Sequence, residues 1–443
     1  MKVTFIQPAI GKKAGQKYIG TWKMEPLTYA TLAGLTPPDV ELALMDDRIE
    51  LIDYEADTDV VAISIETYTA LRAYDIADRF RARGVTVLMG GYHATLAPNE
   101  ARQHADAVLT GNGEKTWPRA LADVKAGRLQ KLYNGQPGYV AVQPNRSIFE
   151  GKRYLPITLA EVGRGCGHHC EFCAISSYYG RAYYPRPVVD IVQDLSGSRH
   201  RFHFIVDDNV VARKAHARAW MRAVAPLGIR WAGQGTLTMA RDPELLKLMF
   251  DSGCRLILIG LESLNDSNLD QMGKSWERAL GERDELIQRV HDAGLGIYAT
   301  FVFGFDGDDE RSFDSTVAFA AKHKFYTAAF NHLLPYPGTK TYERLRAQGR
   351  LLREHWWLDR SYTYGDVAFR PAVMSPERLS ELCRQARHEF SRLGLVGRRG
   401  WAALRRAGPR LWWLYWAMNL SLGEELDRKM MVPLAGNLDE LPK

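Results

Sequence analysis

The sequence has few cysteines, no long apolar run and no common nucleotide-binding fingerprint. The five cysteines among 443 residues are an odd number and three are clustered, which argues against a disulfide scaffold. The aromatic apolar run at residues 411–418 is much too short to span a bilayer. No P-loop, dinucleotide motif or Ser/His/Asp arrangement stands out, and the diffuse net charge of +6 makes nucleic acid an unexpected partner.

The N-terminus enters a strand-like run at once and lacks the long apolar core of a secretory signal peptide. We therefore expect a cytoplasmic protein without a membrane span, in a compartment that keeps thiols reduced. The length and the 46% of hydrophobic residues suffice for two or more cores. Two isolated cysteines, Cys254 and Cys383, are expected to be ordinary packed residues.

The remaining three cysteines, Cys166, Cys170 and Cys173, lie in the run GRGCGHHCEFCA with the spacing Cys-x3-Cys-x2-Cys. Three thiolates on one short loop can hold three irons of a four-iron four-sulfur cube and leave the fourth iron open to a small molecule. A zinc site completed by His168 or His169, a disulfide pair and three buried thiols are the alternatives. The spacing would strain a closed tetrahedral zinc site, so the sequence favours the cube.

This spacing, with Phe172 before the last cysteine, resembles the signature of the radical S-adenosylmethionine (SAM) superfamily. The resemblance implies that the open iron binds the amino and carboxylate groups of SAM. It also implies that the cluster donates one electron, that a carbon–sulfur bond of SAM breaks, and that the resulting radical attacks an inert substrate bond. An electron donor such as flavodoxin or ferredoxin is the implied partner.

The N-terminal third alternates strand-like and helix-like runs. Branched apolar residues predict strands, and residues 69–83 carry one apolar helical face; the strands are expected at 3–6, 40–45, 60–64, 85–89 and 107–109. The pattern predicts a Rossmann-like, doubly wound parallel sheet. Ligands bind beyond the carboxyl ends of such strands, which directs attention to the loops at 64–67, 90–93 and 111–114.

Order and loop composition make residues 1–140 resemble the cobalamin (B12)-binding domain of many radical SAM enzymes. The resemblance implies contacts to cobalamin from the glycine-rich loops: Ser64, Gly90, Gly91, His93, Gly111, Gly113 and Glu114. The Asp-x-His-x-x-Gly element that supplies cobalt with a histidine is missing after the first strand, where Gln7 to Gly11 stand. Cobalamin binding and a vestigial scaffold that lines the active site both stay open, and His93 is expected to be a turn residue bonded to backbone.

A second alternation predicts a partial (β/α)6 barrel. Its strands are expected at 155–160, 201–206, 229–233, 256–259, 297–303 and 328–332. The cysteine loop follows the first strand, and polar residues follow several others, at the carboxyl edge where barrel active sites lie. Polar rims can also simply be solvated. The family resemblance implies that residues 294–304 face adenine. It also implies further SAM contacts at this rim, from Phe172, Asp207, Asp208, Asn209, Gln234, Glu262 and Ser263.

The chain is thus expected to be α/β, with a B12-binding-like domain at 1–140, a radical SAM barrel at 150–345 and a helical extension at 346–443. Trp356, Trp357 and nearby aromatics are expected to close the barrel mouth. An arginine-rich window at 392–410 contains no Asp or Glu and precedes the aromatic run at 411–418. An interfacial membrane helix or an acidic-partner site would fit, but a helix with aromatics on the barrel and solvated arginines is favoured.

The reaction is the least determined point. Cobalamin-dependent radical methylation of a small molecule in secondary metabolism is the first hypothesis. Transfer of the 3-amino-3-carboxypropyl group of SAM, as in arsinothricin-type radical SAM proteins, is the second, and it needs no cobalamin. The third hypothesis is an iron–sulfur electron-transfer module without turnover. The sequence assigns no catalytic residue beyond these cofactor contacts.

Overall fold

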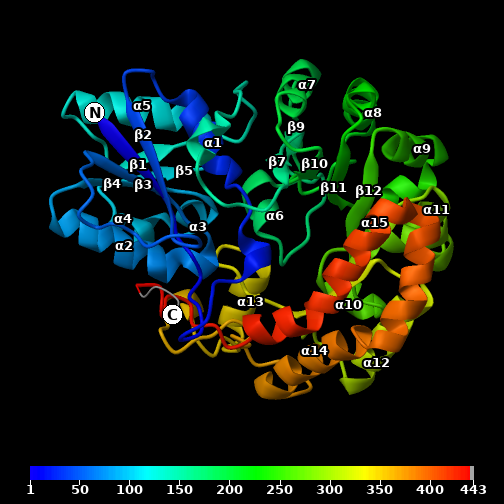
Figure 1. The fold of residues 1–443 in the computed structure, drawn as a ribbon. Coiled ribbons are helices and arrows are strands. Elements are labelled where there is room, and N and C mark those ends of the chain that lie inside the picture. The colour runs from blue at the N-terminus through cyan, green and yellow to red at the C-terminus, as the bar shows by residue number, and fades with distance from the viewer. Residues whose placement is uncertain (440–443) are drawn as a thin grey trace. The chain divides into compact units, whose positions relative to one another are not determined.

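The computed structural model in Figure 1 describes residues 1–439, except for the side chains of residues 405–411, 413, 414, 421–424 and 426 in the last helix. The chain forms two compact units. Unit 1 contains Met1–Leu159, Arg353–Tyr364 and the described part of Arg428–Lys443. Unit 2 contains Ala160–Leu352 and Gly365–Asp427, so each unit is built from separate stretches of the chain.

Unit 1 is built on a six-stranded sheet with the order β2-β1-β3-β4-β5-β6, in which every pair is parallel. Its strands are β1 (Lys2–Gln7), β2 (Glu41–Asp46), β3 (Val60–Ser64), β4 (Thr86–Gly90), β5 (Ala107–Thr110) and β6 (Leu132–Asn134). The main helices are α1 (Leu27–Leu35), α2 (Ala70–Ala82), α3 (Tyr92–Leu96), α4 (Pro98–His104) and α5 (Gly113–Lys125). Figure 1 shows α1 and α5 on one face of the sheet and α2 and α4 on the other, which confirms the doubly wound arrangement.

Unit 2 contains a second six-stranded sheet, with the order β14-β13-β12-β11-β10-β7. Its strands are β7 (Thr158–Ala160), β10 (Phe202–Ile205), β11 (Arg230–Gly235), β12 (Cys254–Glu262), β13 (Gly296–Phe303) and β14 (Thr327–His332). The helices between them are α7 (Val188–Ser196), α8 (Lys214–Val224), α9 (Pro243–Asp251), α10 (Asp266–Gln271), α11 (Arg283–Asp292) and α12 (Glu310–Lys322). Each strand lies beside the preceding strand of this sheet, which confirms the partial barrel.

Shorter elements complete unit 2. After β7, the antiparallel pair β8 (Gly163–Arg164) and β9 (Tyr184–Pro185) encloses the cysteine loop and α6 (Ala174–Tyr179). Helix α13 (Lys340–Ala347) follows β14. The isolated cysteines are packed as expected, since Cys254 and Cys383 are both buried in the unit 2 core.

The helical extension consists of α14 (Pro376–Phe390) and α15 (Leu393–Lys429). Tyr415 Oη donates to the carbonyl of Val396 at 2.6 Å, although a straight helix would separate residues 19 apart by about 28 Å. Helix α15 therefore folds back on itself, as the ribbon in Figure 1 shows. Tyr415 packs edge-on against Tyr326, which agrees with aromatics on the barrel.

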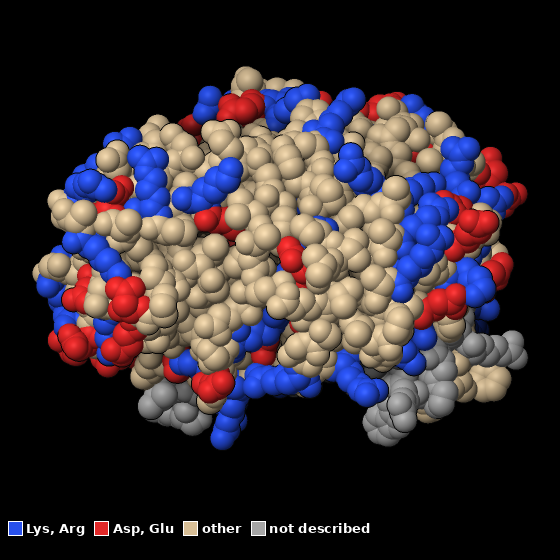
Figure 2. All heavy atoms as spheres, turned by 90° about the horizontal axis from the view of Figure 1, so that it is seen from above, with Lys and Arg blue, Asp and Glu red and all other residues tan. Residues whose placement is uncertain are grey.

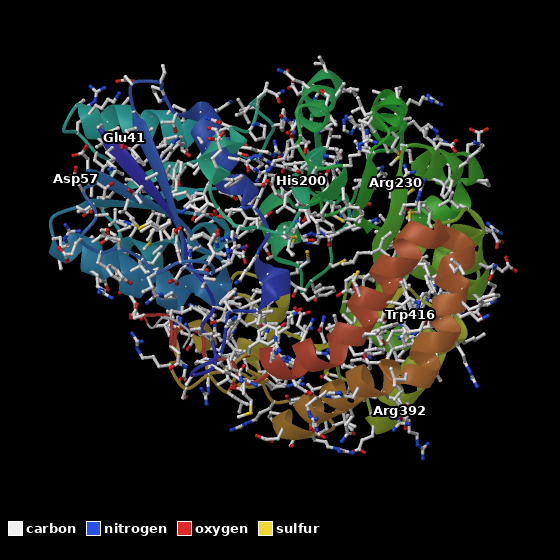
Figure 3. The ribbon with its side chains drawn as sticks, viewed as in Figure 1. Glu41, Asp57, His200, Arg230, Arg392 and Trp416 are labelled. Atoms are coloured by element: carbon white, nitrogen blue, oxygen red, sulfur yellow. The ribbon has the colours of Figure 1, made fainter. Side chains whose placement is uncertain are left out.

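One arginine of the basic window departs from the predicted solvated face. Arg399 is 1% exposed and donates to the Phe390 carbonyl at 2.8 Å, so its guanidinium joins α14 to the α15 hairpin. The side chains of Arg405, Arg406 and Arg410 lie outside the described residues. Figure 3 labels Arg392 between α14 and α15, and Trp416 within α15.

The segment at residues 353–364 packs in unit 1, and its expected role at the barrel mouth stays a prediction. Trp356 and Trp357 are buried there. Trp357 Nε1 donates to Glu100 Oε1 at 3.0 Å, and the Trp356 ring lies 5.2 Å from that of Tyr68. These aromatics pack against α4 and the loop after β3.

The surface drawn in Figure 2 carries positive and negative side chains interspersed with each other. No helix among the described residues is long and apolar enough to cross a bilayer.

Candidate cluster and cofactor sites

The cysteine loop owes its shape to two glycines. Gly165 has φ +86°, and a Cβ there would lie 2.2 Å from the Ala182 carbonyl oxygen. Gly167 also has a positive φ, +80°. Both positions therefore favour glycine, and the loop between them and α6 presents three half-buried cysteines: Cys166, Cys170 and Cys173.

Burial raises the pKa of all three thiols, that of Cys166 to about 11 and that of Cys170 to about 12. Without a metal they are protonated at neutral pH, and binding of iron would expel the protons. Among the described residues, no three His, Cys, Asp or Glu side chains converge closely enough to hold a single metal ion. A four-iron cube sets a different requirement, because each thiolate binds its own iron.

Residues 272–276, which follow α10, pack against this loop. The backbone N–H of Glu171 donates to the Met272 carbonyl at 2.9 Å. His168 stacks on Trp276 with ring centroids 3.8 Å apart and an interplanar angle of 10°. Burial and the nearby positive charge of Lys274 lower the pKa of His168 to about 4, so its ring is neutral.

Several polar atoms on and beside the loop are buried without a hydrogen-bond partner among the described residues. They are His169 Nδ1, Trp276 Nε1, Glu277 Oε2 and Thr341 Oγ1. Buried polar atoms normally have partners, and the N–H and O–H groups among these four are able to donate to the sulfides of a bound cluster. Together with three thiols on one loop, this fits a bound iron–sulfur cluster.

The end of β10 separates its three predicted contacts into two roles. Asp207 Oδ1 accepts from the Val162 N–H at 2.7 Å, and Asn209 Nδ2 donates to the Cys166 carbonyl at 3.1 Å. Both are buried and hold the cysteine loop in place. Asp208 is the partly exposed member, and burial raises its pKa to about 6 although the Gly165 N–H stabilises its carboxylate. We retain Asp208 as the candidate acceptor for an ammonium group.

At the end of β12, Glu262 has φ +60°, a left-handed conformation that is rare for a residue with a side chain. Its carboxylate lies 3.5 Å from Lys274 Nζ, and burial raises its pKa. The next residue, Ser263, is engaged locally, since its Oγ accepts from the Asn265 N–H at 3.1 Å and from Asn268 Nδ2 at 3.2 Å.

The other predicted SAM contacts of unit 2 lie around the same edge. The Gln234 side chain is half-buried at the end of β11 and makes no hydrogen bond to a described residue, while its carbonyl accepts from Val210 N–H. Phe172 packs against the core, 6.3 Å from the ring of Phe305. The 294–304 segment forms β13, and the Gly304 N–H at its end donates to Asp308 at 2.8 Å.

The glycine-rich loops of unit 1 follow three neighbouring strands. Gly91, after β4, has φ +95°, and a Cβ there would lie 2.7 Å from the Ile65 carbonyl oxygen and 2.8 Å from Ser64 Oγ. Gly111, after β5, has φ +69° and its N–H is bound by Thr95 Oγ1 at 2.8 Å. The remaining predicted residues stand at the same ends: Ser64 ends β3, Gly90 ends β4, Gly113 begins α5 and Glu114 is buried in the first turn of that helix.

His93 is fully buried at the start of α3. Its Nε2 lies 2.9 Å from Glu100 Oε1 and its Nδ1 lies 3.3 Å from Thr67 Oγ1. The expected bonds to backbone are therefore replaced by side-chain bonds. With both ring nitrogens engaged, this histidine offers no lone pair to a metal in this conformation.

Two functional features escaped the sequence prediction. Lys274 is a buried lysine eleven positions beyond the predicted rim residue Ser263, in a segment without a recognisable pattern. Glu100 collects hydrogen bonds from His93, Tyr74 and Trp357, the last of these more than two hundred residues away in the chain. Only the run of charged and aromatic residues around Lys274 could have drawn attention to that segment.

Comparisons with known proteins agree with this geometry. The family model of the radical SAM superfamily matches residues 160–320. The bacteriochlorophyllide d C-12(1)-methyltransferase of Chlorobaculum tepidum is 31% identical over 373 residues, which cover 80% of this chain and 80% of that protein. The C-8(2)-methyltransferase of the same organism is 29% identical over 354 residues, 74% of this chain and 78% of that one.

The structure of TsrM, a radical SAM methyltransferase from Kitasatospora setae with cobalamin and a [4Fe-4S] cluster bound, has the same fold. Its TM-score is 0.63 at 14% identity, over 88% of this chain and 81% of that one. The cysteine loop, the barrel edge and the relatives lead to one family. This chain belongs to the radical SAM superfamily: it is an enzyme that uses a [4Fe-4S] cluster and SAM to act on a small-molecule substrate.

Proposed function

We propose that this enzyme transfers a methyl group from SAM to a carbon atom of its substrate, with cobalamin as the second cofactor. The observation that carries the proposal is the 31% identity to a bacteriochlorophyllide d methyltransferase over 80% of both chains. A second methyltransferase for the same named compound matches over 74% of the chain. Similarity at this level supports the reaction type and leaves the choice of small molecule to the substrate pocket.

The residues of unit 2 support the SAM-dependent half of the reaction. When bound, the cluster supplies the electron that cleaves SAM. Cys166, Cys170 and Cys173 would hold it, with Asn209 fixing the loop through the Cys166 carbonyl. We propose that the Asp208 carboxylate accepts hydrogen bonds from the SAM ammonium group. Its neighbours Asp207 and Asn209 are bound to Val162 and Cys166, and Asp208 is the partly exposed acceptor of that strand end.

The fold of unit 1 supports cobalamin as the carrier of the methyl group. In the order β2-β1-β3-β4-β5-β6, β2 is added on one side of β1 and the later strands on the other side. Ligands of such sheets bind at this switch point between β1 and β3. Gly91 after β4 and Gly111 after β5 carry no side chain at the same edge of the sheet, which lets backbone at these two positions approach a flat macrocycle. His93 is hydrogen-bonded to other side chains, and the loop after β1 contains no histidine. We therefore propose that cobalamin binds here without a histidine of these loops coordinating the cobalt.

The two competing reactions have less support. Aminocarboxypropyl transfer would need no cobalamin, yet the relatives that match most of the chain are methyltransferases. An electron-transfer module would need no ammonium-binding carboxylate beside its cluster. We therefore rank both below methyl transfer.

The reducing electron requires a low-potential one-electron donor, and we propose a flavodoxin or ferredoxin for this role. All five cysteines are free in the structure. We propose a cytoplasmic setting, because a thiolate-bound cluster needs a reducing compartment.

The proposal is tested by anaerobic reconstitution with iron and sulfide, followed by SAM and dithionite, with and without hydroxocobalamin. We expect the cluster to release 5'-deoxyadenosine in both cases, and S-adenosylhomocysteine to form beside it only when the corrinoid is present. 5'-Methylthioadenosine would instead identify aminocarboxypropyl transfer. A fully loaded cluster that yields no SAM fragment would favour the electron-transfer module.

A further inference from the structure

A buried lysine connects the strained end of β12 with the segment that clasps the cysteine loop. Lys274 is 4% exposed, and its ammonium group has three oxygen neighbours. Nζ lies 2.6 Å from the Gly260 carbonyl, 2.8 Å from Glu277 Oε1 and 3.5 Å from Glu262 Oε1. An ammonium group has three donors, so all of them are used inside the protein.

Two of these neighbours belong to an unusual strand end. Register with β13 shifts between Gly260 and Glu262, and Glu262 then takes the left-handed φ of +60°. A Cβ on Gly260 would lie 2.0 Å from Glu262 Oε1, so the carboxylate folds back over this glycine. By binding the Gly260 carbonyl and the Glu262 carboxylate together, Lys274 fixes the direction of the glutamate.

The lysine is itself anchored to the cysteine loop through its own segment. Glu171 N–H donates to the Met272 carbonyl at 2.9 Å. A Cβ on Gly273 would lie 3.1 Å from the His169 carbonyl, and Trp276 stacks on His168. The position of the ammonium group is thus tied to the loop that carries the cluster ligands.

One carboxylate oxygen is left for another partner. Glu262 Oε1 faces Lys274, whereas no described residue hydrogen-bonds to Glu262 Oε2. The glutamate side chain retains 11% of its exposure, against 5% for the lysine. Glu262, and not Lys274, can therefore reach a bound molecule.

We infer that Lys274 is a positioning residue that holds Glu262 in a strained conformation so that its free oxygen contacts SAM. This inference rests on the assignment of SAM to this edge of the barrel, and is independent of whether a methyl group or another group is transferred. Loss of the lysine would leave the carboxylate present but misdirected.

The test is a double-variant cycle on SAM affinity, using full-length protein loaded anaerobically with its cluster. Four proteins are compared: wild type, Glu262→Gln, Lys274→Met and the double variant. SAM binding is measured by equilibrium dialysis, and iron content shows that each protein holds its cluster. Lys247→Met, which removes an exposed lysine paired with Asp251, is the matched control.

We expect each single variant to weaken SAM binding about tenfold, as the loss of one charge-assisted contact does, and the double variant to be no weaker than Glu262→Gln alone. Lys247→Met should bind SAM as the wild type does. Independent losses that multiply in the double variant would show that Lys274 does not act through Glu262, and wild-type affinity in Lys274→Met would overturn the inference. If Lys274→Met does not fold, Lys274→Gln gives the same comparison, because its amide can still donate to the Gly260 carbonyl.

Failure of this inference is distinguishable from failure of the proposed function. Release of 5'-methylthioadenosine, or turnover without cobalamin, would refute methyl transfer and leave the SAM affinities unaffected. Multiplying affinity losses would refute the positioning role and leave the product analysis unaffected.

Discussion

In the sheet of unit 1 the order in which strands are added reverses between β1 and β3, whereas the sheet of unit 2 adds each strand beside the previous one. In unit 1 the candidate cofactor contacts are backbone positions made accessible by glycine, such as Gly91 with φ +95°. In unit 2 they are side chains, three cysteines and two carboxylates, held by their neighbours. Two sheets can therefore both present a ligand site at the carboxyl ends of their strands, one through backbone groups and the other through side chains.

The largest effect that separates the two sites is expected for Cys170→Ala. Removal of one of three thiolates should abolish stable cluster binding, because the remaining two cannot hold the cube. Iron content and the visible thiolate-to-iron absorbance should fall to background while cobalamin binding persists. Cys383→Ala, at a buried cysteine outside the loop, is the control that should keep its iron. Loss of cobalamin binding in Cys170→Ala would show that the sites are not independent.

The complementary change in unit 1 is Gly91→Ala. A Cβ would meet the Ile65 carbonyl at 2.7 Å and force a left-handed alanine, so we expect a loss of about 2 kcal/mol or more in unfolding free energy and weaker cobalamin binding. Gly84→Ala is the matched control, since its φ is +80° but nothing lies within 4 Å of the added Cβ. Gly84→Ala should lower the unfolding free energy by only about 1 kcal/mol. The difference between the two variants then separates the cost of the steric clash from the cost of a positive φ. Equal losses in the two variants, measured by urea unfolding, would contradict this account.

Asp208→Asn sharpens the assignment of roles within one strand end. The amide removes the negative charge that pairs with the SAM ammonium group, so the dissociation constant for SAM should rise about tenfold. Iron content should stay at the wild-type value, because Asp207 and Asn209 hold the loop. An unchanged affinity, measured by equilibrium dialysis, would remove Asp208 from the SAM site.

The smallest effect is expected for Ser263→Ala. Its Oγ is engaged with Asn265 and Asn268, so the change should lower the unfolding free energy by about 1 kcal/mol and alter SAM affinity less than about threefold. A loss as large as that of Asp208→Asn would return Ser263 to the list of direct SAM contacts.

Patterns of short range allowed the sequence to predict both sheets and the cysteine loop. The strands are runs of branched residues, and Cys166, Cys170 and Cys173 are ligands that lie on one loop. The ends of the strands could be located because they follow these runs. The separate roles of Asp207, Asp208 and Asn209 could not, because they depend on which side chain faces Val162 or the Cys166 carbonyl. Adjacent polar residues look alike until the fold sets their directions.

Contacts across long stretches of sequence could not be predicted. Trp357 donates to Glu100 within unit 1, 257 positions earlier in the chain, and no local pattern around either residue indicates this contact. Lys274 lies in the turn after α10, and its inferred role depends on its contact with Glu262. No residue pattern predicts the left-handed conformation of that glutamate. Helix α15 folds back on itself and buries Arg399. This also depends on tertiary packing, because the sequence around Arg399 predicts a solvent-exposed polar helix face.

The function proposed for this enzyme depends on three cysteines that hold a cube with one iron open to SAM. Electron paramagnetic resonance of the dithionite-reduced, reconstituted protein tests it most directly, before and after addition of SAM. We expect iron analysis to give four irons per chain, and the cluster signal to change clearly when SAM binds the open iron. A signal that SAM leaves unchanged, or zinc in place of iron after anaerobic purification, would contradict it.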